Sequence, residues 1–169
     1  MKMRIIASTF VVLLMSITVS AQLPRFTRDT STLDQPVVTD NLTGLMWQGC
    51  QIGASGNTCA TSNSLAIKMS WSEAIAACEA LDWGRNSDWR LPNRKELFSL
   101  IENRSESGFL DLTAFPNTSS AHAFWSSTTK ATNDDFAWTV DFTSGSLDSG
   151  DKDYYQDDSA ARCVRGTSK

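Results

Sequence analysis

The chain has 169 residues, of which 41% are hydrophobic and 20% are charged, with 15 Lys and Arg against 19 Asp and Glu. This length is typical of one domain. The net charge of −4 leaves no basic footprint for nucleic acid, which is therefore excluded as an expected partner.

The first 21 residues have the pattern of a secretory signal. A basic start at Lys2 and Arg4 precedes an apolar run over residues 5–19, and small residues end it at Ala21. We therefore predict a signal peptide over residues 1–21 and a single domain over residues 22–169. The alternative is a membrane anchor, but the run is shorter than the roughly 20 residues that span a bilayer. We expect an extracytoplasmic protein (periplasm, cell surface or secreted) with no membrane span after cleavage and a net charge of −6, because Lys2 and Arg4 are lost.

Four cysteines remain after export: Cys50, Cys59, Cys78 and Cys163. An even number in an exported chain predicts two disulfides, for which three connectivities exist. Cys50 and Cys59 flank a short polar loop with two glycines, which favours a bridge between them and leaves Cys78 with Cys163. A structural zinc site is the alternative. However, the chain has no CxxC motif, and its single histidine, His122, is not spaced from any cysteine as zinc ligands usually are.

The first part of the domain predicts short strands. Residues 22–36 are polar without a clear period, whereas residues 37–39 and 45–48 are strand candidates on either side of turn residues at 40–44.

Two capping boxes mark the middle of the chain. Ser70 and Glu73 predict a helix that ends at Gly84, with Cys78 on its apolar face. Asn93 and Glu96 predict a second helix that extends to about Asn103.

The last third is predicted to be β. Residues 104–122 resemble a long loop, and they precede strands at 123–128, 136–142, 146–148 and 160–165 with a hairpin turn at 143–146. Helices in the middle of an antiparallel sheet predict an α+β fold, with two helices packed on one small twisted sheet.

Together these segments resemble the family named for the C-terminal domain of the Legionella collagen-like adhesin. The central block is also similar, more distantly, to formylglycine-generating enzymes. Both resemblances imply a C-type-lectin-like fold, in which a bridge joins the first helix to the last strand, as Cys78 and Cys163 would. The segments that carry the resemblance are residues 40–47, 71–78, 88–97, 124–127 and 162–165.

The family resemblance implies adhesion, since the adhesin binds sulfated polysaccharide. This chain lacks the collagen stalk, and its predicted charge of −6 works against a polyanionic ligand. We therefore expect a non-enzymatic binding module for a glycan, a cell-surface polymer or a protein receptor.

Two polar segments are the candidate ligand site, because binding residues concentrate on loops. These segments are residues 130–135 and 148–158, and one aromatic residue near a strand end is added to them. The candidate ligand contacts are Trp125, Asn133, Asp134, Asp135, Tyr154 and Tyr155. The second segment is also rich in hard oxygen ligands, so calcium is the one cofactor that we consider. Its candidate ligands are Asp148, Asp151, Asp153, Asp157 and Asp158. The alternative is a solvated acidic hairpin.

Two other functions remain open. A structural component of a surface assembly would need an exposed apolar patch, for which Phe109, Leu110, Leu112 and Phe115 are candidates, although they are also consistent with a small core under the loop. An oxidase similar to formylglycine-generating enzymes would need two reactive cysteines near the C-terminal part. Only Cys163 lies there, so we expect no enzymatic activity.

Overall fold

The computed structural model describes residues 23–32, 34–60, 68–102, 109–118, 123–154 and 159–166. The predicted signal peptide lies outside these residues. No helix in the described part is both long and apolar enough to cross a membrane.

The first sheet has four antiparallel strands. They are β1 (Phe26–Asp29), β2 (Val37–Asp40), β3 (Met46–Gln48) and β7 (Val164–Arg165), in the order β1-β2-β3-β7. The register places Arg28 opposite Val38, Val38 opposite Trp47, and Trp47 opposite Val164. Paired residues share a face of the sheet, so a row of mostly apolar side chains points inward.

The second sheet is an antiparallel meander of three strands in sequence order. They are β4 (Phe124–Lys130), β5 (Asn133–Asp141) and β6 (Ser146–Asp151). The predicted turn between β5 and β6 is confirmed, with Gly145 at φ 69°. A side chain at this position would be strained by that φ, and its Cβ would also lie 2.8 Å from the Phe109 ring.

Both predicted capping boxes are present, and each starts a short helix. Ser70 caps α1 (Trp71–Glu79) and Asn93 caps α2 (Arg94–Phe98). The carboxylate of the Glu at the third helical position accepts a hydrogen bond from the backbone N–H of the cap residue, Glu73 from Ser70 and Glu96 from Asn93. The sequence therefore predicts where the helices begin, through groups that satisfy their first N–H donors.

The helices end earlier than predicted. After α2, Leu100 N–H donates to Leu97 O and Ile101 N–H to Phe98 O, which is the tighter i to i−3 pattern of a terminating turn. The Ser99 hydroxyl also donates back to Glu96 O, so it competes for the carbonyl that would continue the helix.

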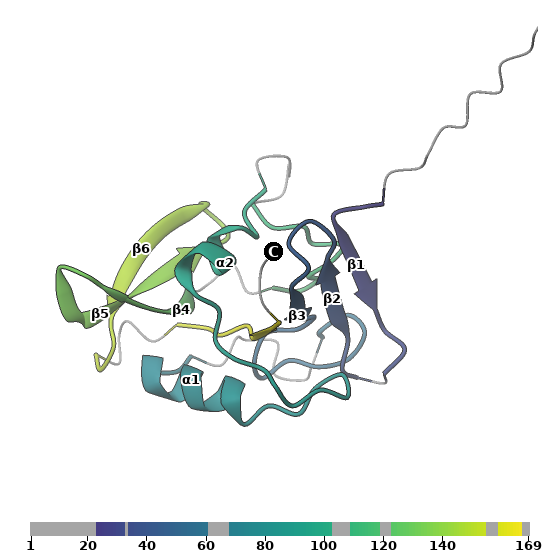
Figure 1. Ribbon diagram of the computed structural model, residues 1–169, viewed down its shortest axis with the longest axis horizontal. Coiled ribbons are helices and arrows are strands. Elements are labelled where there is room, and N and C mark those ends of the chain that lie inside the picture. Colours follow the sequence, from purple (N-terminus) through teal and green to yellow (C-terminus); the bar gives the residue numbers. More distant parts are fainter. Residues whose placement is uncertain are drawn as a thin grey trace, which may run out of the picture.

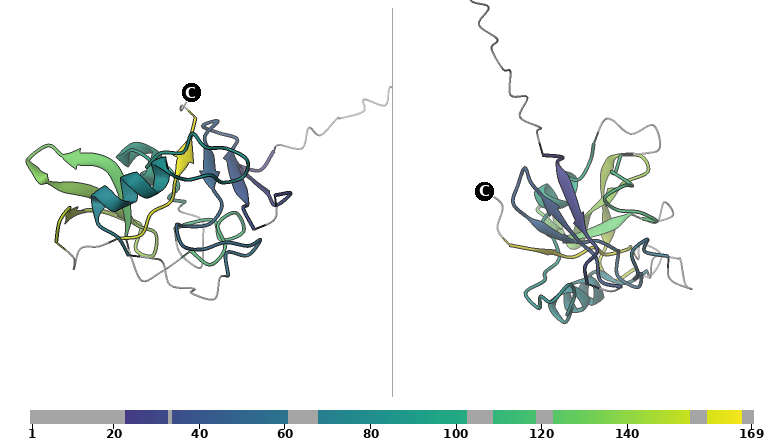
Figure 2. Two further views of the ribbon diagram at one scale, coloured as in Figure 1. Left: turned by 90° about the horizontal axis from the view of Figure 1, so that it is seen from below. Right: turned by 90° about the vertical axis from the view of Figure 1, so that its right-hand side faces the viewer.

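The expected fold class is therefore wrong. The described chain is mostly β, with two separate antiparallel sheets and two short helices, and not an α+β, C-type-lectin-like domain with two helices on one small sheet. Figures 1 and 2 show the two sheets on opposite sides of the molecule. The helices supply nine and five residues, too few to form a layer of their own.

The main core fills the space between the sheets and α2. It combines Trp47 and Val164 from the first sheet with Phe124 and Val140 from the second, and Leu97 from α2. Each of these five residues has no exposed surface. Leu110 and Phe115 belong to the same core, so two of the four residues considered for an apolar surface patch pack inside.

A second core lies around α1 and holds both disulfides. Cys78 on α1 is bonded to Cys163, which directly precedes β7, and Cys50 is bonded to Cys59. Both pairings are those that the sequence favours. The longer bridge spans 85 residues of chain and ties α1 to the first sheet.

Candidate binding site at the tip of the three-stranded sheet

The structure brings the two predicted polar segments together at one end of the second sheet. Lys152 follows β6, and its N–H donates to Asp135 O at 3.0 Å while its Nζ donates to Asp134 O at 2.7 Å. We call this region the sheet tip; it comprises residues 129–135 and 151–154 together with Trp71. Figure 1 shows it as the end of β4 and β5 at the left of the molecule.

The two segments are more regular than predicted. Lys130 ends β4 and Asn133 begins β5, so only Ala131 and Thr132 form the turn between them. Likewise, Asp148 and Asp151 belong to β6 and not to a long loop. The pairing of Phe136 with Asp151 extends β5 and β6 to the tip, because backbone hydrogen bonding overrides a polar sequence.

Most of the predicted ligand contacts that the structure describes are accessible. Asn133, Asp134 and Asp135 are exposed, and Tyr154 exposes 46% of its surface. Tyr155 lies outside the described residues. An exposed phenol ring can stack on a sugar ring, and exposed carboxylate and amide groups can bind its hydroxyls.

Trp125 is a correction to the predicted site. Its side chain is completely buried, and its indole N–H donates to Met69 O at 2.9 Å. The ring therefore packs in the second core, and Trp125 is not a surface contact for a ligand.

Trp71 is a residue of the sheet tip that is not among the candidate contacts named from the sequence. Its indole N–H donates to Ser126 O at 2.8 Å, and the Lys152 ammonium lies 4.1 Å from the ring centroid. The same ammonium donates to Thr129 Oγ1 at 3.0 Å. Lys152 thus links α1, β4 and β5, and no motif in the sequence indicates that these residues meet.

The opposite side of the tip also has cations above aromatic rings. Arg94 of α2 lies 4.8 Å from the Trp138 ring centroid, and the Lys130 ammonium lies 5.8 Å from both Phe136 and Trp138. Lys130 also donates to Ser149 Oγ at 3.0 Å. Since these cations occupy the ring faces, Trp138 and Phe136 present less open aromatic surface than Tyr154 does.

The acidic residues of β6 do not converge on a cation in the described part of the chain, where no group of three or more His, Cys, Asp or Glu side chains is arranged to hold a metal. Asp148 Oδ1 accepts from Ser149 N–H, and Asp151 Oδ1 accepts from Asp153 N–H, so these carboxylates bind nearby backbone. Asp157 and Asp158 lie outside the described residues, and calcium binding stays a prediction.

The comparison with protein families decides the relationship of this chain. Residues 36–165 match the model of the Lcl C-terminal domain, which is more than half of the sequence. The chain belongs to this family. The Lcl C-terminal domain match includes both disulfides, both helices and the whole sheet tip. A comparison with curated proteins found no match.

Proposed function

We propose that this Lcl C-terminal domain protein is a non-enzymatic binding module that acts outside the cytoplasm and contacts a glycan or cell-surface polymer through its sheet tip. The family name is consistent with an adhesin-like module. Two disulfides are compatible with an oxidising, extracytoplasmic compartment. The observation that carries the proposal is that Lys152 joins the segment before exposed Tyr154 to the exposed polar residues Asp134 and Asp135 at one end of the sheet.

Charge favours a neutral ligand over a polyanion. The chain is acidic overall, and three exposed carboxylates (Asp134, Asp135 and Asp153) surround the tip. The nearby cations Lys130 and Lys152 are engaged with aromatic rings and hydroxyl oxygens. A neutral sugar would use the aromatic face and the carboxylate oxygens without charge repulsion.

The sheet tip is tested by a glycan array with the purified, oxidised protein, run once with calcium and once with a chelator. We expect binding to at least one neutral glycan. Loss of binding with the chelator would support calcium ligation by the acidic segment, whereas unchanged binding would place recognition on Tyr154 and its neighbours. Silence on every glycan under both conditions would contradict the glycan proposal.

Removing one aromatic ring gives a sharper test. Tyr154→Ala should weaken binding by about five- to tenfold, because a stacked ring contributes roughly 1 kcal/mol. Leu112→Ala is the matched control, since Leu112 exposes a similar 43% of its surface but is not part of the tip. Equal affinity of the Tyr154→Ala variant and the unmodified protein in titration calorimetry would rule out stacking at this residue.

A protein partner in a surface assembly is the second candidate function. Phe98 and Leu112 expose 41% and 43% of their surfaces, which are large fractions for apolar side chains. This role predicts silence on the glycan array and crosslinking of the protein to a neighbour on intact cells.

An oxidase role has less support. All four cysteines are paired in disulfides, so no thiol pair is available for the chemistry of formylglycine-generating enzymes. We propose that the protein has no such activity, and conversion of a peptide cysteine to formylglycine would contradict this.

A further inference from the structure

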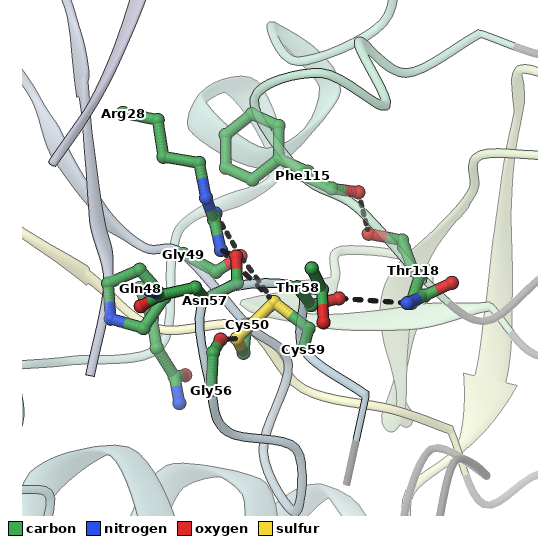
Figure 3. Close-up of a disulfide and its surroundings, with 12 residues drawn as sticks. Arg28, Gln48, Gly49, Cys50, Gly56, Asn57, Thr58, Cys59, Phe115 and Thr118 are labelled. Atoms are coloured by element: carbon green, nitrogen blue, oxygen red, sulfur yellow. Dashed lines mark hydrogen bonds between the residues drawn. A yellow bond between two sulfur atoms is a disulfide. The ribbon is translucent and has the colours of Figure 1, made fainter. Parts of the chain in front are cut away.

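The two disulfides have different electrostatic surroundings. Cys59 Sγ lies 3.4 Å from Nη2 of Arg28, a contact drawn in Figure 3. No such cation contacts the Cys78–Cys163 bridge among the described residues, where apolar side chains of the second core surround it. A cation beside sulfur lowers the pKa of the corresponding thiol, because it stabilises the thiolate.

Arg28 is held in place by contacts that do not depend on the sulfur. Its Nη1 donates to Gly49 O at 3.0 Å and to Ala114 O at 2.7 Å, and its Nη2 donates to Asn57 O at 2.8 Å. Burial lowers the pKa of Arg28, but guanidinium stays protonated at neutral pH. The positive charge at Cys59 is therefore preorganised.

A second guanidinium strengthens this positive field. Arg162 Nη1 donates to Gly49 O at 3.1 Å, and this carbonyl oxygen lies 3.3 Å from Cys59 Sγ. Burial, together with the charge of Arg28, lowers the pKa of Arg162 to about 9, which leaves it charged at neutral pH. The salt bridges found in the described chain pair Arg25, Arg90 and Arg165 with carboxylates, and none involves Arg28 or Arg162.

We propose that Cys50–Cys59 is a thiol–disulfide exchange site for a dithiol, in which Cys59 is the leaving thiolate and Arg28 is a positioning residue. A thiolate of the dithiol attacks Cys50 Sγ, a new sulfur–sulfur bond forms there, and the electron pair of the broken bond moves to Cys59 Sγ beside Arg28. The second thiol of the dithiol then attacks the first sulfur of the dithiol, which is bonded to Cys50 Sγ in this mixed disulfide. Cys50 leaves and takes up that thiol's proton, so the dithiol is oxidised and the bridge is reduced by two electrons. The lower pKa of the leaving thiol accelerates the first step.

The domain is built to keep its fold through this exchange. The Cys78–Cys163 bridge is untouched, and the loop between Cys50 and Cys59 has independent anchors: Gly56 N–H donates to Asp34 O, and Asn117 Nδ2 donates to Thr58 O. Cys50 and Cys59 are 0% and 2% exposed. Attack therefore requires a local lift of the loop, which selects small or flexible dithiols.

The site is tested with the oxidised protein and dithiothreitol, by timed alkylation and peptide mass spectrometry that follow each bridge separately. We expect Cys50–Cys59 to be reduced first, with the near-ultraviolet circular dichroism unchanged. The pH midpoint for alkylation of Cys59 should lie below about 8.5, the ordinary thiol value. Reduction of Cys78–Cys163 first, or of both bridges together, would overturn the proposal.

Arg28→Gln removes the charge but retains an amide that can donate to carbonyls. It should raise the Cys59 midpoint by about one pH unit and slow reduction about threefold. Arg28→Lys should restore most of both effects, and Arg165→Gln is the control because Arg165 pairs with exposed Asp88. If Arg28→Gln does not fold, Cys50→Ala leaves Cys59 as a free thiol beside Arg28, and a Cys59 midpoint at or above 8.5 in that variant contradicts the proposal.

Discussion

Arg162 shows how one buried cation can organise several segments of the chain. It has no exposed surface, and it donates to Gln48 O, Gly49 O and Thr118 Oγ1. Its guanidinium also lies 4.7 Å from the ring centroid of Phe115. These contacts join the segment that leads into β7 to the end of β3 and to the 109–118 segment, so hydrogen bonds from one buried cation hold three parts of the chain together.

Removing this side chain should be costly. Arg162→Ala removes its hydrogen bonds to Gln48 O and Thr118 Oγ1, whereas Gly49 O keeps the donor Arg28. Each unsatisfied group costs about 1–3 kcal/mol, so we expect the free energy of unfolding to fall by about 2–6 kcal/mol. Urea denaturation measures the change. Arg165→Ala is the control, because its partner Asp88 is exposed, and it should have a much smaller effect. Equal losses in the two variants would contradict the role of Arg162.

Individual site residues were only partly predictable. Composition is enough to name the candidate contacts Asn133 to Asp135 and Tyr154, since acidic and aromatic clusters are visible in sequence, and the structure leaves these residues exposed. The burial of Trp125 could not be predicted, because Phe124, Trp125 and Ser126 are all buried, so both faces of β4 are covered at this end and alternation gives no signal. The contact of Lys152 with Trp71 joins residues 81 positions apart, and no local pattern encodes it.

At the scale of elements, α2 depends on one carboxylate. This carboxylate, on Glu96, accepts the capping hydrogen bond from Asn93 N–H and one hydrogen bond at 2.8 Å from each terminal nitrogen of Arg90. Burial opposes ionisation, but the hydrogen bonds from Arg90 and the Asn93 backbone outweigh it, so the pKa of Glu96 lies below its usual value. A helix of five residues has little stability of its own and needs such contacts.

Glu96→Gln should therefore destabilise the protein in a pH-dependent way. A carboxyl with a depressed pKa in the folded state stabilises the fold above its unfolded value of 4.5, and the contribution is lost as the pH falls through the folded value. At pH 7 we expect a loss of about 1.5–3 kcal/mol. The difference between the two proteins should shrink in denaturation curves recorded below pH 4.5.

The matched control for this helix is Glu73→Gln. Glu73 has the same place in the capping box of α1, but it is exposed and has no arginine partner in the described structure. It should cost less at pH 7 and show a weaker pH dependence. A pH-independent effect of Glu96→Gln would refute the ionic origin of the stabilisation.

A strand cannot be predicted from alternation where a charged side chain takes one of its inward positions. β1 was missed, because charged Arg28 takes the inward position that follows Phe26, opposite Val38, and so hides the alternation. The capped helix starts and the Gly145 turn were found, since those signals are local hydrogen-bonding and φ preferences. Helix ends and strand extensions depend on tertiary pairing, and they were misplaced.

For the whole molecule, the connectivity of the cysteines was predictable and the layer arrangement was not. The composition of the loop between Cys50 and Cys59 favoured a bridge between them, and the remaining two cysteines, Cys78 and Cys163, then had to pair. The prediction of one sheet lacked β1 and made α2 too long. With β1 present and α2 reduced to five residues, the described chain contains more strand than helix and forms two sheets. The two sheets then share a core that also includes α2.

This architecture predicts unequal contributions from the two disulfides to global stability. In the chain-entropy view, a bridge that closes 85 residues restricts the unfolded chain more than one that closes nine, by about 4.6 against about 2.6 kcal/mol. The paired substitution Cys78→Ala with Cys163→Ala should therefore lower the free energy of unfolding by about 2 kcal/mol more than Cys50→Ala with Cys59→Ala. Urea unfolding of both double variants measures the difference. A larger loss on removal of the short bridge would mean that the contacts of Arg28 and Arg162 around Gly49, and not chain entropy, dominate the stability of the domain.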